Sequence, residues 1–305
     1  MTTQMYIKDY PRPQFVREQW INLNGEWDFR FDDDNVGERE NWYVDLQADR
    51  KIRVPFTYET KLSGIGEETF HPQVWYEKKL TLPAEAAGKR AILHFQAVDY
   101  RAKLWVNGVY VGQHQGGYAA FSFDITPYVT FGSENVLSVK VEDSDSCTQP
   151  RGKQRWQNDN FECFYVQTTG IWQTVWMEFV DSAHVDAVKI TPDFDRRSVT
   201  FEYQVAGDLK GDSPLELETV ISLKGQTVKR MRLAIDRPWL RADADLLHEA
   251  SGPWKFSEWS PQRPNLYDVE FILYRDGQVV DHVYSYFGVR KISIENGKVL
   301  LTVPT

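Results

Sequence analysis

The chain has little cysteine and no long apolar run. Its two cysteines, Cys147 and Cys163, are too few for a disulfide scaffold in 305 residues. No run of 18 apolar residues occurs, which argues against a transmembrane helix. Residues 1–10 are polar and lack the apolar core of a secretory signal. We therefore expect a cytoplasmic protein with two reduced thiols, because disulfides form in oxidising compartments. A single bridge between the two cysteines is the alternative.

An excess of positive charge is also absent. The chain carries 35 Lys and Arg against 44 Asp and Glu, a net charge of −9. This balance argues against nucleic acid or an anionic membrane as a partner, since both call for basic patches. The six histidines show no metal-ligand spacing, and neither a calcium loop nor a phosphate loop occurs. The sequence therefore predicts no metal site and no cofactor.

What is present is an ordinary globular composition that is rich in aromatic residues. Hydrophobic residues make up 42% and charged residues 26%, which excludes a disordered chain. Aromatic residues make up 14%, and they favour pleated, half-buried surfaces. In residues 91–97 and 137–142 every second residue is apolar and the residues between are expected to face away, as in half-buried strands. Helical periodicity is not sustained anywhere over three turns, and residues 124–128 could form one helical turn at most. The pattern predicts an all-β protein.

Three dipeptides mark β-hairpins. Asn107-Gly108 lies between apolar runs and predicts a two-residue turn that pairs Val106 with Val109 and Leu104 with Val111. Asp276-Gly277 and Asn296-Gly297 predict two more. Many short strands with such turns favour β-sandwiches. A boundary near residues 180–184 leaves an immunoglobulin-sized unit that ends near residue 286.

Several short motifs follow one another along the chain. Leu23-Asn24-Gly25-Glu26-Trp27 stands near the start, and Gly170-Ile171-Trp172-Gln173 with Val175-Trp176 lies within residues 169–176. Further motifs lie in residues 54–56, 75–76, 105–112, 117–126, 259–267 and 287–290. In this order, they resemble glycoside hydrolase family 2, in which the first motif opens the first domain and the second is the "GIWQ-VW" segment. This family includes β-galactosidases, β-glucuronidases and β-mannosidases.

The resemblance implies a domain order and a parent reaction. It implies a jelly-roll sugar-binding domain over residues 1–181 and an immunoglobulin-like β-sandwich over residues 182–289. Residues 290–305 would lead to a (β/α)8 barrel that this chain lacks and that carries two catalytic glutamates in the family. The parent reaction would be retaining hydrolysis of a terminal β-glycosidic bond, with this portion bracing the barrel and shaping its sugar pocket. No catalytic residue is therefore assigned here. Residues 301–305 depart from the family's usual "LNGKP".

The long polar and aromatic stretch 144–170 is the first candidate loop, because loops of this length are usually functional or disordered. In β-galactosidases and β-glucuronidases an aspartate six residues before the glycine of the "GI" pair reaches into the active site. Here that position is Phe164, so either Glu162 or Asp159 does this work or the sugar is bound differently. Trp156 and Asn160 complete the candidate substrate-binding set in this loop. The alternative is that its aromatic rings only pin the loop to the sandwich.

The second candidate loop is residues 63–72, which the resemblance also directs toward the barrel. Gly64 and Gly66 permit positive φ. Glu67, Glu68 and His71 are its candidate substrate-binding residues, and His71 could donate to a sugar hydroxyl. The alternative is an ordinary surface loop.

The acidic runs predict solvated surface rather than chemistry, because Asp and Glu are mostly exposed. These runs lie at residues 32–40, 67–68 and 142–145. Two other function classes remain open at this point: a free-standing carbohydrate-binding module or lectin, and a protein-interaction sandwich. The expected partners are a β-linked sugar and the barrel. Without the barrel, the aromatic loops would face water, and they are then expected either to be mobile or to be covered by a second copy of the chain.

Overall fold

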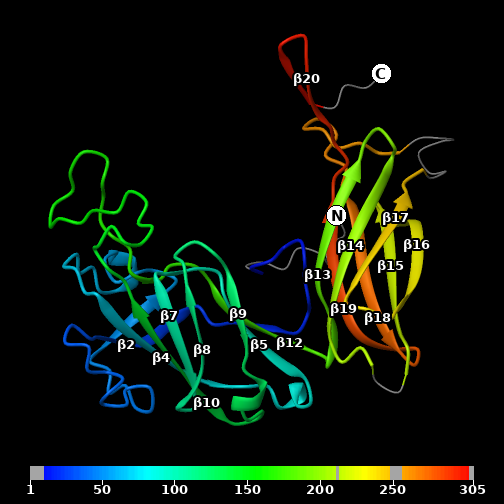
Figure 1. Cartoon of the computed structure of the whole chain (residues 1–305). Helices are drawn as coiled ribbons and strands as arrows, with labels where there is room; N and C mark the ends of the chain where they lie inside the picture. Colours follow the sequence, from blue (N-terminus) through cyan, green and yellow to red (C-terminus); the bar gives the residue numbers. More distant parts are fainter. Residues whose placement is uncertain (1–9, 211–212, 248–255, 302–305) are drawn as a thin grey trace. The chain divides into compact units, whose positions relative to one another are not determined.

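The computed structural model describes residues 10–210, 213–247 and 256–301. The chain forms two compact units (Figure 1). One unit is Gln19–Phe179, and the other combines the described residues before Gln19 with those after Phe179. Helix within the described ranges is limited to three short 3₁₀ turns, η1 (Lys61–Ser63), η2 (Ala84–Ala86) and η3 (Thr126–Tyr128). None of the helices in these ranges is long and apolar enough to span a membrane. The all-β prediction is confirmed.

The first unit is a sandwich of two sheets. One sheet has the order β1-β12-β5-β9, with β1 (Trp20–Asn22), β12 (Val175–Val180), β5 (Arg90–Phe95) and β9 (Phe121–Asp124). The other has the order β3-β2-β4-β10-β7-β8, with β3 (Arg50–Val54), β2 (Gly25–Phe31), β4 (Gln73–Thr81), β10 (Glu134–Glu142), β7 (Arg101–Val106) and β8 (Val109–Gln115). A short pair joins β6 (Val98–Asp99) to β11 (Gly170–Ile171).

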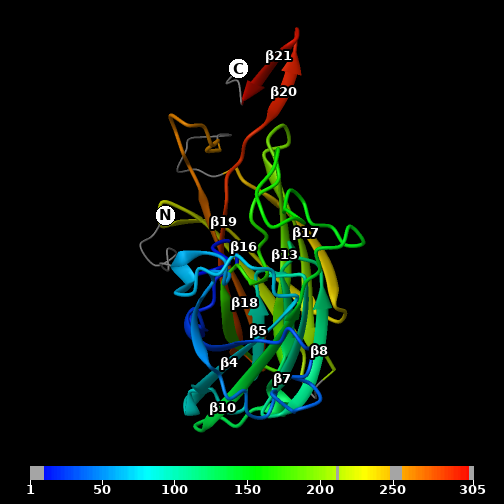
Figure 2. The same cartoon turned by 90° about the vertical axis from the view of Figure 1, so that its left-hand side faces the viewer.

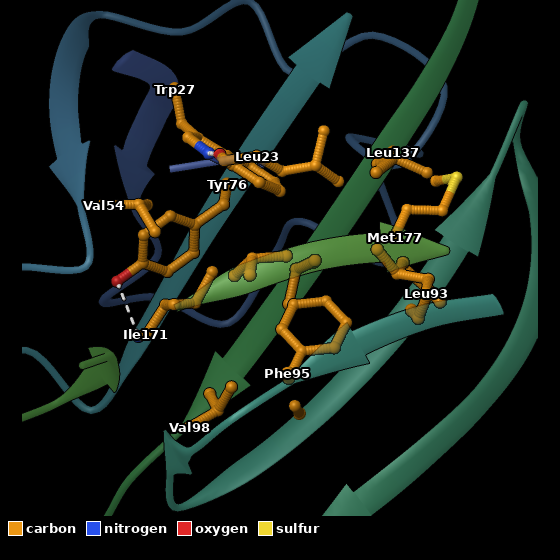
Figure 3. Packing of buried hydrophobic residues seen from close by; sticks show 14 of the residues in the cluster. Leu23, Trp27, Val54, Tyr76, Leu93, Phe95, Val98, Leu137, Ile171 and Met177 are labelled. Carbon is orange, nitrogen blue, oxygen red and sulfur yellow. Dashed lines mark hydrogen bonds between the residues drawn. The ribbon is translucent and has the colours of Figure 1, made fainter. Parts of the chain in front are cut away.

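The core of the first unit lies between these sheets. Trp27, Tyr76, Phe95 and Met177 are buried there in a single cluster (Figure 3). The Tyr76 hydroxyl accepts a hydrogen bond from the Ile171 amide. A Cβ on Gly170, whose φ is +108°, would lie 2.0 Å from that hydroxyl oxygen. Glycine is therefore required where the long loop rejoins the sandwich.

Residues 32–48 cover part of the outer face of the six-stranded sheet. Their apolar side chains form a second, smaller cluster with Trp75 and Trp105. Asp32 fixes the segment, since its carboxylate accepts hydrogen bonds from the Val36 and Gly37 amides and from the Trp75 indole. The expectation that the whole acidic run is solvated is wrong for Asp32, which is buried.

Residues 32–48 also bury the side chains on the outer side of β10. The periodicity of residues 137–142 predicts a half-buried strand, yet Ser138 and Lys140 on its polar side are each only 1% exposed. The Lys140 ammonium lies 2.9 Å from both the Asn35 side-chain oxygen and a Glu38 carboxylate oxygen. Burial alone would raise the pKa of Glu38, but hydrogen bonds from Lys103 and Lys140 hold it below its usual value.

The three predicted hairpins form, and two of them carry a register shift, one next to Leu104 and one next to Leu273. Both central residues have positive φ at Asn107-Gly108, Asp276-Gly277 and Asn296-Gly297, as a type I′ turn requires. Val106 pairs with Val109 as predicted, but Leu104 pairs with Gly112 and not with Val111. The register shift next to Leu104 inserts one extra residue.

The second unit is also a two-sheet sandwich. One sheet has the order β13-β14-β17, with β13 (Ala183–Asp193), β14 (Ser198–Gly207) and β17 (Trp239–Asp245). The other has the order β16-β15-β18-β19, with β16 (Gln226–Ile235), β15 (Leu215–Leu223), β18 (Tyr267–Arg275) and β19 (Gln278–Phe287). The hairpin of β20 (Ile292–Glu295) and β21 (Lys298–Leu301) follows (Figure 2).

Residues 10–18 belong to the second unit, although the sequence-based interpretation placed them in the first domain. Val16 and Tyr284 exchange two backbone hydrogen bonds, which adds this segment to the edge of β19. The Arg17 guanidinium forms a buried ion pair with Asp281 at 2.9 Å, and the Asp281 carboxylate also accepts the Val185 amide at 2.8 Å. Along the sequence, a segment of the second unit therefore precedes the first unit.

Candidate functional site

Both candidate loops lie in the first unit and are joined by one buried arginine. The long loop appears as the green coil that extends from the end of this sandwich (Figure 1). The Arg155 guanidinium donates to the Glu68 carbonyl at 3.1 Å, to the Gln167 side chain at 3.1 Å and to the Asn160 side chain at 3.2 Å. Gln167 donates to the same Glu68 carbonyl at 3.0 Å. The structure thus brings Glu68 and Asn160 together, and it does so through Arg155.

An aromatic hairpin forms the outer part of the long loop. Backbone hydrogen bonds pair Arg155 and Lys153 with Tyr165. Trp156, Phe161 and Phe164 pack against one another with ring centroids 4.5–5.0 Å apart. These rings hold the hairpin together and leave about half of Trp156 exposed, at 49% of its surface.

The remaining candidates of the long loop lie on its surface. Asp159 and Glu162 are exposed, and Glu162 has φ +47°. Phe164, at the position where the resemblance expects an aspartate, is half-buried within the aromatic hairpin. An open site could use Asp159 or Glu162 as hydrogen-bond acceptors.

In the shorter loop the two other candidates have structural partners. The His71 ring lies 3.7 Å from the Phe31 ring in a stacked arrangement, and its Nδ1 lies 2.8 Å from an Asp33 carboxylate oxygen. That nitrogen is therefore engaged and does not reach out to a ligand. Glu67 accepts a hydrogen bond from the Thr69 amide, and the Thr69 hydrogen bonds lower the pKa of this carboxyl.

Beneath the long loop lies a cluster of buried carboxyls that sequence reasoning missed. The Thr169 amide donates to Glu59 at 3.0 Å, and the Thr169 hydroxyl donates to Asp143 at 2.6 Å. Gln154 donates to Asp99 at 2.8 Å. The three acids are 2–6% exposed. The expectation that residues 142–145 are solvated is therefore wrong for Asp143.

Burial sets the protonation of this carboxyl cluster. It raises the pKa of Glu59 to about 7 and that of Asp99 to about 6, and the pKa of Asp143 rises for the same reason. The acids also repel one another, which adds to the rise at Glu59 and Asp99. Arg151 lies 3.9 Å from Asp143 and offsets part of this repulsion.

The carboxyl cluster anchors the loop and is not arranged for glycoside hydrolysis. A retaining glycosidase needs two carboxyls about 5–5.5 Å apart on either side of a bound sugar, whereas Glu59 and Asp99 are closed off from solvent. Over the described ranges, no group of three or more His, Cys, Asp or Glu side chains is arranged to hold a metal ion. In the sequence, one signal pointed toward the carboxyl cluster. It was the family resemblance, through the "GI" segment that begins at Gly170.

Comparison with known proteins decides the family. The family model "Glycosyl hydrolases family 2, sugar binding domain" matches residues 20–178, and the model "Glycosyl hydrolases family 2" matches residues 183–290. The chain belongs to glycosyl hydrolase family 2. The family 2 β-sandwiches account for both units.

The similar curated proteins are a β-galactosidase and β-glucuronidases, which are longer than this chain. A β-galactosidase of Thermoanaerobacter pseudethanolicus is 27% identical over 76% of this chain and 30% of its own length. A β-glucuronidase of Paenibacillus borealis is 26% identical over 96% of this chain and 48% of its own. The chain thus spans less than half the length of these relatives.

Solved structures agree on the fold. A family 2 member from Bacteroides cellulosilyticus superposes with a TM-score of 0.69 at 25% identity, over 93% of this chain and 38% of that one. The β-glucuronidase of Ruminococcus gnavus superposes with a TM-score of 0.70 at 20% identity, over 94% of this chain and 48% of that one. This chain therefore resembles the N-terminal domains of family 2 β-glycosidases.

Proposed function

We propose that this chain is the non-catalytic N-terminal portion of a retaining β-glycosidase, in which its two candidate loops shape the entrance to the sugar pocket. The observation that carries the proposal is the joining of both loops by Arg155 at one place on the sandwich. Substrate-shaping loops need such support, because a displaced contact costs binding. The exposed Trp156 indole supplies an apolar face suited to a sugar ring or an aglycone.

The clustered carboxyls support a division of labour between domains. Those that the structure describes are buried and hold the loop, so we expect the acid and the nucleophile of the reaction to come from a catalytic domain outside these residues. The sandwiches then contribute positioning and not chemistry. The specificity for a particular sugar is determined largely by that catalytic domain.

The proposal is tested on the product of the complete reading frame. Its sequence is expected to continue past codon 305 into a (β/α)8 barrel, and the product is expected to hydrolyse a nitrophenyl β-glycoside. In that product Trp156→Ala raises KM and leaves kcat nearly unchanged, since it removes binding made equally in ground and transition states. Trp239→Ala, an exposed tryptophan of the second unit, is the control. An unchanged KM in Trp156→Ala, or a frame without a barrel, would refute the proposal.

A further inference from the structure

Three asparagines of this chain are followed directly by glycine, a dipeptide that is prone to lose the asparagine side-chain amide. They are Asn24-Gly25, Asn107-Gly108 and Asn296-Gly297. In this reaction the glycine nitrogen attacks the side-chain carbonyl carbon of the asparagine, and glycine favours the attack because it has no side chain in the way. The dipeptide is the same at all three positions, so any difference between them comes from the structure around each asparagine.

The side chain of Asn107 is held in place by three hydrogen bonds. Its amide group donates to the Tyr128 carbonyl at 2.8 Å and to the Asn135 side-chain oxygen at 2.9 Å. Its side-chain oxygen accepts the Val136 amide at 2.8 Å. The turn joins β7 to β8, which belong to the six-stranded sheet. The side chain therefore cannot turn toward the glycine nitrogen unless several hydrogen bonds break first.

Asn24 is held in a similar way, at the start of β2. Its side-chain oxygen accepts the Val175 amide at 3.1 Å, and its amide group donates to the Thr174 hydroxyl at 3.2 Å. Both partners lie about 150 residues further along the chain, on the neighbouring sheet of the sandwich. The folded first unit thus immobilises this asparagine as well.

The side chain of Asn296 lacks such support. It is exposed, and it has no hydrogen-bond partner among the residues that the structure describes. Its turn joins β20 to β21, and of the described strands these two pair only with each other (Figure 2). The amide of Asn296 is therefore free to rotate and is open to water.

The hairpin around Asn296 also buries little apolar surface. Ile292, Ile294 and Val299 are 63–77% exposed, and a two-stranded hairpin without a packed face is only marginally stable in water. We therefore expect it to open often. Opening promotes the attack, because the turn with positive φ at both central residues has to relax before the Gly297 nitrogen can reach the Asn296 side chain.

We propose that Asn296 is a site of spontaneous deamidation in this chain, whereas Asn24 and Asn107 are protected by the fold. The Gly297 nitrogen loses its proton and forms a bond to the Asn296 side-chain carbon. The bond from that carbon to the amide nitrogen breaks, and ammonia leaves. Water then adds to one of the two carbonyls of the cyclic imide, which opens to aspartate or isoaspartate. The inference is independent of the proposed function, because it requires neither a barrel nor catalysis.

The reaction would alter the hairpin permanently. Either product places a new negative charge next to Glu295. Isoaspartate also adds one carbon to the backbone, and a two-residue turn that pairs Glu295 with Lys298 cannot accommodate it.

The experiment follows all three asparagines in the folded 305-residue chain. The protein is incubated in a mildly alkaline buffer, digested under acidic conditions and mapped by mass spectrometry, which separates each asparagine peptide from its acidic products. Asn296 is expected to convert at least about tenfold faster than Asn24 and Asn107, which corresponds to about 1.4 kcal/mol in activation free energy. The same chain unfolded in urea is the reference, and there the three rates should lie close together.

Two variants assign the product in the intact protein. Asn296→Gln lengthens the side chain and disfavours closure of the ring, so the acidic form seen by ion-exchange chromatography should disappear. Asn158→Gln is the matched control, since Asn158 is exposed but is followed by aspartate, and it should leave the acidic form unchanged.

Three results would overturn the proposal. They are conversion of Asn296 no faster than that of the other two asparagines in the folded chain, an equally large lead of Asn296 in urea, or an undiminished acidic form in Asn296→Gln. Because no turnover is measured, such a failure leaves the proposed function standing.

Discussion

Glu59 is a buried acid whose carboxylate helps to hold the end of the long loop in place. Its carboxylate accepts the Thr169 amide while Asp143 accepts the Thr169 hydroxyl, so the end of the long loop depends on two acids from other parts of the chain. Burial raises the pKa of Glu59 from 4.5 to about 7. The folded state therefore holds its proton more tightly than the unfolded state. Stability should be highest below about pH 4.5 for this group and should fall as the pH rises toward 7.

Glu59→Gln should remove this pH dependence. The amide keeps an oxygen acceptor for Thr169 and carries no charge, so the variant should be more stable than the original protein at pH 8 by about 1–3 kcal/mol. At pH 4.5 the two proteins should melt at nearly the same temperature. Thermal unfolding at both pH values measures the effect, and Glu134→Gln, an exposed acid of β10, is the control. A variant that is less stable at pH 8 would contradict the assignment.

Gly108 provides a second test at the level of a single residue. Its φ is +77°, and a Cβ there would approach the Val44 side chain to 3.4 Å. Gly108→Val should destabilise the first unit by about 1–3 kcal/mol, because a β-branched residue resists positive φ. The change is read from the melting temperature. An unchanged value would mean that the turn relaxes without strain.

At the scale of elements, strand positions could be predicted from periodicity, whereas what covers each strand could not. The Asn-Gly and Asp-Gly turns specify φ locally, so the three hairpins follow from their dipeptides. The burial of Lys140 depends on residues 32–48, which lie far away in sequence and supply Asn35 and Glu38 as its partners. The same limit applies to the site. Glu68 and Asn160 could be named from their loops, but Arg155 becomes the linking residue only once those loops meet.

Removal of the Arg155 side chain should increase the mobility of both candidate loops together. In Arg155→Ala the Glu68 carbonyl and the Gln167 side chain lose a charged donor. Amide hydrogen exchange should accelerate about tenfold or more in residues 64–71 and 153–167, since such a hydrogen bond contributes roughly 1.5–3 kcal/mol. Arg53→Ala, an exposed arginine of β3, is the control. Faster exchange in only one loop would show that Arg155 does not couple them.

At the scale of the whole molecule, each unit has its own core. The second core includes Phe15, which comes from the segment before the first unit. A sequence-based boundary near residue 181 could not anticipate this, because residues 10–18 show no strand periodicity of their own. Their place is decided by pairing with β19 and by the buried Arg17–Asp281 ion pair.

Arg17→Ala should therefore destabilise the second unit and not the first. Asp281 would remain buried without its guanidinium partner, at a cost of about 3–5 kcal/mol. Hydrogen exchange read separately for residues 19–179 and 183–289 distinguishes the units. Arg241→Ala, which breaks an exposed contact with Asp243, should change neither. Equal loss of protection in both units would contradict the separation of the cores.

The 305-residue chain alone should not hydrolyse glycosides, because its clustered carboxyls are buried. The assay uses nitrophenyl β-galactoside, β-glucuronide and β-mannoside with repurified protein. Turnover above that of a heat-inactivated sample, surviving repurification, would place catalysis within these residues.

The return of residues 10–18 to β19 also sets an order for folding on the ribosome. Arg17 and Asp281 are 264 positions apart. At a synthesis rate of about 5–20 residues per second, the segment waits roughly 10–50 s for its partner strand. The first sandwich can close during that interval, since all its strands emerge earlier. Residues 10–18 are thus among the last of the described segments to reach their final place.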